Sequence, residues 1–378
     1  MDSPPASPEP HATATRLAAA GKVLALAWII FLAVGHAAVW RQGADFLNFW
    51  SAGRFVLEGR AAEAYDVGRL VAWQQAQGFP RAQPFVSPPP FLILAAPLGL
   101  LIYPAALAVW IAAGYAAYAL SLRWLPRAVY WPAVAFPGAL LAAMAGQSAL
   151  ILTALMCAAV GALPRRPALS GLFVGLMVLK PQLALLTPVA FAAAGAWRAF
   201  AVAAATVIGV LGLSVAVLGW EPMAAFLGSA DYLNGLFARP ELLPKIKSVY
   251  ATLVLNGASP AAALTGQGVA AAFAAGAVWR VWRATDAPLA RGAALAAATP
   301  LAPPYLLLYD IVFLALPTVW LLREGLERGF RRGERAALAA VFFLPIATLM
   351  APATWPIVPL WSLGLTLAVL QRLAPPRR

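Results

Sequence analysis

The sequence predicts an all-α polytopic membrane protein, and its composition and the distribution of its charges lead to that prediction. Hydrophobic residues make up 62% of the 378 positions and charged residues only 11%, with a mean hydropathy of +0.79. The apolar residues form runs long enough to cross a bilayer as helices. The basic residues lie in short clusters between these runs, as topology signals do. This composition excludes a soluble multidomain enzyme.

The net charge of +13 indicates membrane topology rather than nucleic-acid binding, because the basic residues are scattered between hydrophobic segments. Membrane lipids are therefore expected as partners, and nucleic acid is not. Cys157 is the single cysteine, and His11 and His36 are the two histidines. Zinc, haem and iron–sulfur sites need clusters of such ligands, so the sequence predicts no metal and no cofactor.

In chain order, residues 1–20 are predicted to be a disordered cytoplasmic tail, and residues 21–373 a single integral membrane domain. Hydropathy gives about twelve transmembrane helices in that domain. The apolar segments lie at 22–40, 105–122, 130–145, 149–163, 167–179, 182–196, 199–219, 260–279, 292–304, 305–322, 336–350 and 356–371.

The apolar segment 91–102 is too short for a clear decision, so the positive-inside rule decides whether it crosses. If it does not cross, 18 of the 27 basic residues lie in the cytoplasm, whereas only six do so if it crosses. We therefore expect residues 88–103 to form a re-entrant or interfacial helix on the outer side. Both termini are then cytoplasmic, and the loops 41–104 and 220–259 are extracytoplasmic, the first containing an amphipathic helix.

Asp45 follows the first span and is flanked by Phe46, Phe49 and Trp50, aromatic residues typical of a membrane–water boundary. A carboxylate in such an apolar rim has a pKa closer to neutrality and suits a general base that deprotonates a hydroxyl. The alternative is a helix N-cap. In the same loop Arg54 is a candidate phosphate ligand, unless it belongs with Glu58 to a solvated helix face.

Lys180 ends the apolar segment 167–179, which rises only about 20 Å through a hydrocarbon core of about 30 Å. An ammonium group at that depth requires a polar cavity or an anion. The alternative is that Lys180 snorkels to the outer interface. Pro181 and Gln182 directly after it indicate a broken helix that lines a cavity.

Two further polar residues interrupt apolar stretches. Asp310 follows the proline-rich stretch 299–304, and an intramembrane carboxylate is a functional candidate. Its alternative role is a structural bond to Tyr309 or to backbone freed by the prolines. Gln147 stands between two apolar runs, where its amide could bond a sugar hydroxyl or pack helices. Under the predicted topology Asp45, Gln147, Lys180 and Asp310 all lie at the outer leaflet.

The order of these short motifs resembles the polytopic GT-C glycosyltransferases, specifically glycosyltransferase family 87, the polyprenol-phosphate-mannose-type mannosyltransferases. The resemblance covers roughly residues 20–372. It is carried by Asp45-Phe46-x-x-Phe49-Trp50-x-Ala52-Gly53-Arg54, Ala64-Tyr65-Asp66, Ser87-Pro88-Pro89-Pro90-Phe91, Gly146-Gln147-Ser148, Leu179-Lys180-Pro181-Gln182 and Pro304-Tyr305 to Tyr309-Asp310.

This resemblance implies a GT-C-like fold and an inverting transferase that needs no metal. Its donor is a polyprenyl-phosphate sugar, a mannose-like hexose or a pentose, and its acceptor is a hydroxyl of a lipid or glycan at the outer face of the cytoplasmic (inner) membrane. Asp45 matches the catalytic aspartate. Members of the family place histidine in the region matching Tyr309-Asp310, where this chain has none. The substrate-binding positions implied are Asn48, Arg54, Gln147, Lys180, Gln182, Tyr309 and Asp310.

Two other functions compete with this one. In a transporter or flippase of a lipid-linked glycan, Lys180 and Asp310 would be charges along the transport pathway. No internal repeat is visible between the two halves of the sequence, which weakens a transporter built from inverted repeats. The third possibility is a non-catalytic membrane partner that retains the scaffold.

Overall fold

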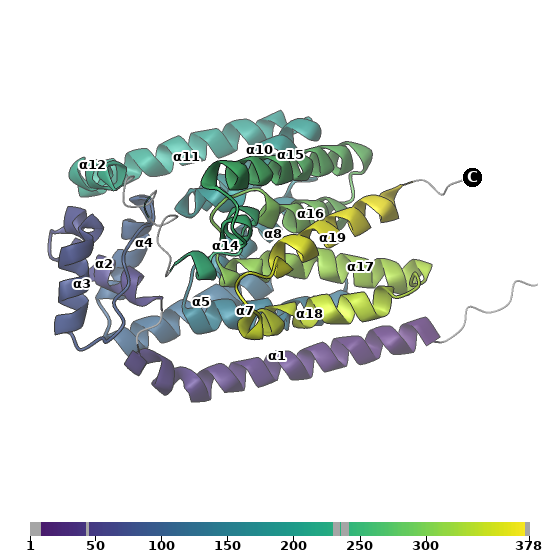
Figure 1. Ribbon diagram of the computed structural model, residues 1–378, viewed down its shortest axis with the longest axis horizontal. Helices are drawn as coiled ribbons and strands as arrows, with labels where there is room; N and C mark the ends of the chain where they lie inside the picture. Colours follow the sequence, from purple (N-terminus) through teal and green to yellow (C-terminus); the bar gives the residue numbers. More distant parts are fainter. Residues whose placement is uncertain (1–8, 43–44, 230–234, 236–241, 375–378) are drawn as a thin grey trace, which may run out of the picture.

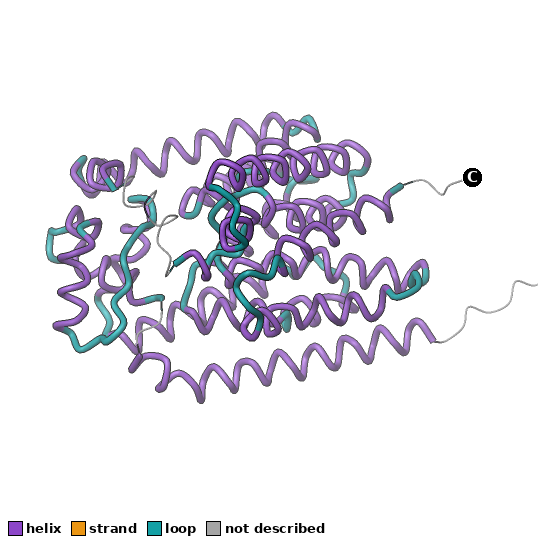
Figure 2. Tube along the Cα trace, in the orientation of Figure 1, coloured by secondary structure: helices purple, strands orange, loops and turns teal. Residues whose placement is uncertain are grey.

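The computed structural model describes residues 9–42, 45–229, 235 and 242–374. Over these residues the chain forms helices, and one isolated antiparallel bridge pairs Ile246 with Leu307. The long helices lie side by side along one axis, with the loops gathered near their ends (Figures 1 and 2).

The helices and 3₁₀ turns (η) are as follows: α1 (Glu9–Gln42), α2 (Leu47–Leu57), η1 (Ala61–Tyr65), α3 (Val67–Ala76), α4 (Pro90–Gly99), α5 (Tyr103–Ser121), α6 (Arg127–Val134), α7 (Pro137–Ala145), α8 (Ala149–Ala162), α9 (Pro167–Leu176), η2 (Met177–Leu179), η3 (Pro181–Ala184), α10 (Thr187–Ala193), α11 (Trp197–Leu218), α12 (Glu221–Gly228), η4 (Leu243–Lys245), α14 (Val249–Leu255), α15 (Pro260–Ala284), α16 (Pro288–Ala298), η5 (Thr299–Leu301), η6 (Leu308–Leu314), α17 (Ala315–Arg328), α18 (Glu334–Met350) and α19 (Ile357–Leu373).

The described part of the chain has the all-helical character predicted for a polytopic membrane protein. Each of the twelve predicted apolar segments overlaps a helix. Five helical stretches are long and apolar enough to cross a membrane, namely Ala12–Gly35, Tyr103–Ser121, Arg127–Ala145, Trp197–Leu218 and Pro260–Ala284. The number of crossings, about twelve, stays a prediction.

The N-terminal segment differs from the prediction of a disordered tail over residues 1–20. Helix α1 begins at Glu9, so most of that segment is helical, while residues 1–8 lie outside the described residues. The physical reason is local, because alanines at 12, 14 and 18–20 favour the helix and allow the membrane span to continue toward the N-terminus.

The two described chain ends lie at the same end of the bundle. In Figure 1 the start of α1 and the end of α19 lie on the right, and α2, α3, α4 and α12 lie on the left. The left-hand elements belong to the segments predicted as the two large loops. The end of the bundle that holds α2, α3, α4 and α12 is called the loop end, and the end that holds the described chain ends is called the terminal end.

The first loop folds around its own aromatic core at the loop end. Phe49 stacks on Phe91 with ring centroids 4.3 Å apart, and Phe46 and Phe49 both contact Trp110 of α5. Helix α4 has ten residues and rises only about 15 Å, too short for a full crossing, and it packs along α2. This core fixes the direction in which the chain leaves Asp45.

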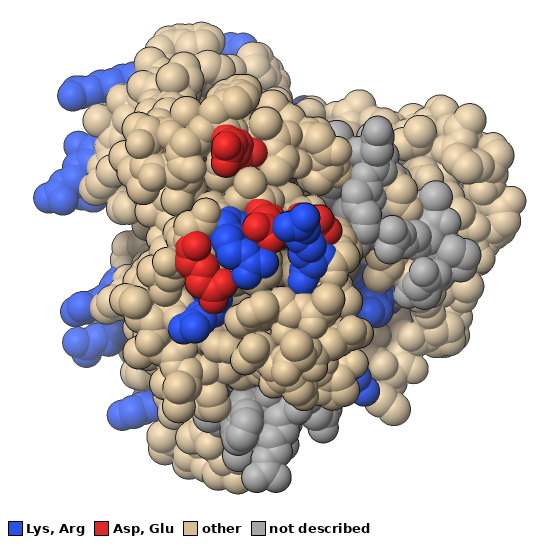
Figure 3. Space-filling view, turned by 90° about the vertical axis from the view of Figure 1, so that its left-hand side faces the viewer, with Lys and Arg blue, Asp and Glu red and all other residues tan. Residues whose placement is uncertain are grey.

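The charged residues of the first loop neutralise one another on its outer face. Acidic and basic side chains lie next to one another on the loop end of the molecule (Figure 3). Arg60 pairs with Glu58 and Glu63, and Arg69 pairs with Glu63 and Asp66. The hydrogen bonds from the two arginines lower the pKa of the half-buried Glu63 to about 2. These residues form a solvated face.

The second loop is attached to the chain just before Asp310. Its predicted range was 220–259, of which 230–234 and 236–241 lie outside the described residues. After η4, Ile246 forms the bridge with Leu307, and the backbone N–H of Lys247 donates to the carbonyl of Leu306 at 2.7 Å. This attachment brings η4 to the stretch that leads into η6.

Candidate active site

Asp45 lies in the turn between α1 and α2, beside Gln147 at the end of α7. The Gln147 amide Nε2 donates to the Asp45 carboxylate Oδ2 at 3.3 Å. Gly146 makes this approach possible, because its φ of +63° suits glycine and a Cβ there would lie 2.6 Å from the Cβ of Phe46. A glycine that ends α7 therefore brings the Gln147 amide to Asp45.

Lys180 occupies a break between two 3₁₀ turns, η2 and η3, rather than a continuous helix. Its ammonium Nζ donates to the Asp310 carboxylate Oδ1 at 2.5 Å and lies 4.8 Å from the centre of the Tyr309 ring. The Asp310 side chain is 1% exposed and that of Lys180 is 12% exposed. The other carboxylate oxygen of Asp310 accepts the backbone N–H of Leu307 at 3.1 Å.

The two pairs lie close enough to affect each other electrostatically. Burial raises the pKa of Asp45 above its ordinary value of 3.8. The hydrogen bond from Gln147 and the positive charges of Lys245 and Lys180 oppose this rise in the pKa of Asp45, and the negative charge of Asp310 adds to it. The structure therefore brings together residues that are spread over most of the sequence.

This arrangement has the chemical components of a transfer site. Asp45 is half-buried, its Oδ2 is held by Gln147, and its Oδ1 accepts no hydrogen bond from the described residues. A carboxylate with a raised pKa and a free oxygen can accept a proton from a bound hydroxyl. Lysine ammonium groups nearby can stabilise an anion.

The remaining predicted residues lie at different distances from this group. Asn48 is buried in the first turn of α2, and its Oδ1 has no hydrogen-bond partner among the described residues. Gln182 is half-buried on η3, two residues after Lys180. The guanidinium Nη1 of Arg54 donates to the carbonyl of Gly99 at 3.2 Å, where α4 ends, and its role as a phosphate ligand stays a prediction. Arg54 therefore joins α2 to α4.

Lys245 was not predicted as a site residue. It is an exposed residue at the end of η4, and its positive charge lowers the pKa of Asp45 more than that of Lys180 does. A signal was present in the sequence, because Lys245 and Lys247 lie in a predicted outer loop, where the positive-inside rule disfavours cations.

A large cavity lies away from these residues. It has a volume of about 820 Å³ and lies at the terminal end between α1, α17 and α18, with Leu17, Leu24, Phe330 and Phe342 among its mainly apolar lining residues. The polar group around Asp45 lies at the loop end. The cavity and the polar group around Asp45 therefore lie at different ends of the bundle.

Comparison with known proteins identifies a family. The family model of glycosyltransferase family 87 matches residues 85–309, more than half of the chain. No curated protein and no solved structure matches. The matched range contains Gln147, Lys180, Gln182 and Tyr309, whereas Asp45 and Asp310 lie outside it. Asp45 accepts a hydrogen bond from Gln147, and Asp310 accepts one from Lys180, so both aspartates contact residues of the matched range.

Proposed function

The chain belongs to glycosyltransferase family 87 and is a membrane glycosyltransferase, and from that premise we propose that Asp45 is the general base of its transfer reaction. The donor is a polyprenyl-phosphate sugar, carrying a mannose-like hexose or a pentose. The acceptor is a hydroxyl group of a lipid or glycan. The observation that carries this proposal is the half-buried carboxylate of Asp45, with its raised pKa, held by Gln147.

The reaction is a single displacement with inversion. The acceptor oxygen forms a bond to the anomeric carbon of the sugar, its proton passes to Asp45, and the bond from that carbon to the phosphate oxygen breaks. The electron pair leaves with polyprenyl phosphate, whose negative charge increases. A raised pKa suits Asp45 to accept the proton, because a carboxylate with a pKa of 3.8 is a weak base at neutral pH.

The other residues of the site are proposed to hold the substrates. An ammonium group has three N–H donors, and Asp310 uses one of those of Lys180, so two remain for a phosphate. Tyr309 and Asp310 both contact that ammonium group and orient it. The unpartnered amide oxygen of Asn48 and the side chain of Gln182 are available for sugar or acceptor hydroxyls.

We place the site on the outer face of the cytoplasmic membrane, with both termini in the cytoplasm. Two observations support this orientation. The described chain ends lie together at the end of the bundle opposite the first loop (Figure 1). The distribution of basic residues puts the end with the termini inside.

The test is Asp45→Asn in purified protein reconstituted with a polyprenyl-phosphate-linked sugar. Loss of the base should lower the transfer rate by about 10²- to 10⁴-fold. Asp66→Asn is the control, because Asp66 is exposed in the same loop and asparagine also caps a helix N-terminus. Transfer by Asp45→Asn at the wild-type rate would refute the assignment.

The same variant separates the transferase from a transporter of a lipid-linked glycan. A transporter with Asp45→Asn would continue to move its cargo, and sugar transfer would be absent from the wild-type protein as well. Mass spectrometry of cell-envelope lipids and glycans with and without the gene identifies the sugar. A missing hexose or pentose names it directly.

A further inference from the structure

Lys245 is a second cation that acts on Asp45, besides Lys180. Its side chain is exposed, and it makes no ion pair with any residue that the structure describes. The ammonium of Lys180, by contrast, is paired at 2.5 Å with a carboxylate that is 1% exposed. The two lysines therefore differ in what they can offer an incoming anion.

The fold holds Lys245 through a continuous series of contacts. Its neighbour Ile246 is bridged to Leu307, and the N–H of Leu307 donates to the Oδ2 of Asp310. The Oδ1 of Asp310 accepts from Lys180. One backbone bridge and one side-chain hydrogen bond thus connect the neighbour of Lys245 to the buried ion pair, so the backbone beside Lys245 is anchored to that pair.

Lys245 cancels the net negative charge that the group around Asp45 would otherwise carry. The Lys180–Asp310 pair is neutral as a unit, so without Lys245 the group carries the negative charge of Asp45 alone. A phosphodiester would then be repelled. With Lys245 the described group is neutral before the ligand arrives, and a singly charged phosphodiester is accommodated at a lower electrostatic cost.

We propose that Lys245 binds the phosphate of the lipid-linked donor, while Lys180 positions that phosphate from within its ion pair with Asp310. This inference rests on the proposed function. It assigns donor recognition to the second loop, which approaches the site from the side of η6. It also favours a donor with one phosphate, because each additional phosphate would add negative charge that no described free cation in this group balances.

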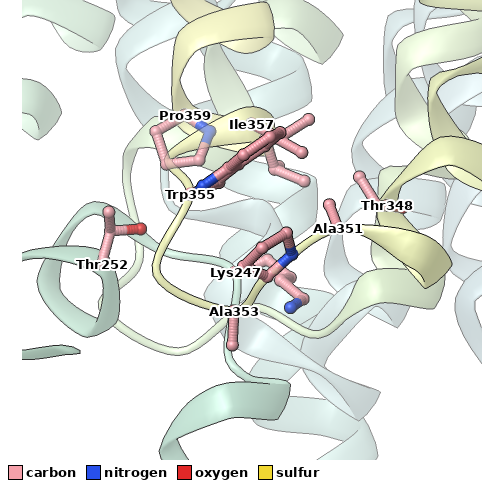
Figure 4. Close-up of a pocket in the computed structure, with 10 residues that line it drawn as sticks. Lys247, Thr252, Thr348, Ala351, Ala353, Trp355, Ile357 and Pro359 are labelled. Atoms are coloured by element: carbon pink, nitrogen blue, oxygen red, sulfur yellow. The ribbon is translucent and has the colours of Figure 1, made fainter.

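Lys247 provides a matched comparison within the same loop. Its ammonium donates to the carbonyl of Pro244 at 2.9 Å and is half-buried. It lines a small cavity together with Thr252, Trp355 and other residues near α18 and α19 (Figure 4). Burial lowers the pKa of Lys247. The ammonium group of Lys247 is therefore already bonded within the protein, although Lys247 lies only two residues after Lys245.

The experiment measures the binding of a short-chain prenyl phosphodiester, methyl geranylgeranyl phosphate, to the purified full-length protein in detergent, because this probe has the single negative charge of the donor. Geranylgeraniol, which lacks the phosphate, reports binding of the chain alone. We expect Lys245→Met to weaken phosphate binding about tenfold, the effect of one partly screened charge, and to leave alcohol binding unchanged. Lys245→Arg should retain most of the affinity, and Lys247→Met should bind both compounds as the wild type does.

Three outcomes would overturn the inference. Lys245→Met could bind the phosphate like the wild type, it could lose affinity for phosphate and alcohol equally, or Lys247→Met could show the same selective loss. Because binding is measured without turnover, the proposed function can fail separately. If Asp45→Asn keeps full transfer activity while Lys245→Met loses phosphate binding, the phosphate site stands and the assignment of the base is wrong.

Discussion

At the scale of single residues, the proposed chemistry depends on how burial and hydrogen bonding set the proton affinity of Asp45. Burial disfavours the charged carboxylate and raises the pKa of Asp45, whereas the bond from Gln147 stabilises the charged form. The base must be deprotonated to act. Activity should therefore rise with pH as Asp45 loses its proton, with a midpoint above the ordinary value of 3.8.

Replacing Gln147 with leucine should shift this acid limb to higher pH. The substitution removes a hydrogen bond to the charged form, so the pKa of Asp45 rises further and less of the base is active at a given acidic pH. The measurement is the pH profile of kcat/KM for transfer, which reports the free enzyme. Gln77→Leu, at an exposed position, should keep the wild-type profile. An acid limb that stays in place, or moves to lower pH, contradicts the proposed role of the amide.

The Lys180–Asp310 pair should show the asymmetry of buried ion pairs. Lys180→Met leaves a carboxylate that is 1% exposed without its counter-charge, at a cost of about 3–5 kcal/mol. The double variant Lys180→Met/Asp310→Asn removes both charges and can retain the bond from the Leu307 N–H. Thermal unfolding of the purified proteins should show a large loss of stability in the single variant and a partial recovery in the double variant.

Sugar transfer separates positioning from stability at this pair. The double variant should remain impaired in transfer even where its unfolding midpoint recovers, because the ammonium group that holds the phosphate is absent. A double variant with wild-type transfer would show that the pair serves only the fold. If Lys180→Met is as stable as the wild type, the ion pair between Lys180 and Asp310 does not form in the folded protein.

At the scale of elements, the position of Asp45 depends on the close contact between α2 and α4. Gly53 of α2 and Gly99 of α4 face each other, and a Cβ on Gly99 would lie 2.6 Å from the carbonyl carbon of Gly53. A Cβ on Gly53 would meet the carbonyl oxygen of Ala95. Arg54 adds its bond to the Gly99 carbonyl at the same contact. Asp45 is two residues before α2, so this contact also positions the proposed base.

Gly53→Ala should force the two helices apart and lower stability by about 1–3 kcal/mol, the usual cost of overpacking. Transfer activity should fall as well, because the start of α2 moves with the helix. Gly68→Ala is the matched control, since Gly68 is exposed in the first turn of α3 and alanine is the better helix former. The measurement is the thermal unfolding midpoint, which should be lower for Gly53→Ala than for Gly68→Ala. Equal midpoints would show that the α2–α4 contact can relax.

At the scale of the whole molecule, the end that carries the site and the end that carries the termini should lie on opposite sides of the membrane. Single cysteines at Gln77, beyond α3, and at Arg332, between α17 and α18, occupy exposed positions at these two ends. The native Cys157 is buried and can remain in place. An impermeant maleimide applied to intact cells should label Q77C, and should label R332C only after the membrane is permeabilised. The reverse pattern would invert the topology.

The sequence by itself determined the class of this protein, because hydropathy and charge placement are summed over local segments. The helices overlap every predicted apolar segment, and α4 is too short to cross. The sequence also identified Asp45, Lys180 and Asp310 as candidates, because a charged side chain within or beside an apolar run is costly to place in a membrane. The beginning of α1 was predicted less well, because alanines before residue 20 allow the helix to extend beyond the apolar span.

Only the tertiary structure decided which of these candidates meet. Gln147 and Asp45 are separated by 102 positions and Lys180 and Asp310 by 130, and no local pattern specifies such pairs. Packing brought Lys245 toward the site through the bridge from Ile246 to Leu307, and it directed Arg54 to the end of α4. Hydrophobicity acts along each segment and can be read there, whereas the position of a charge among its partners depends on how distant segments pack.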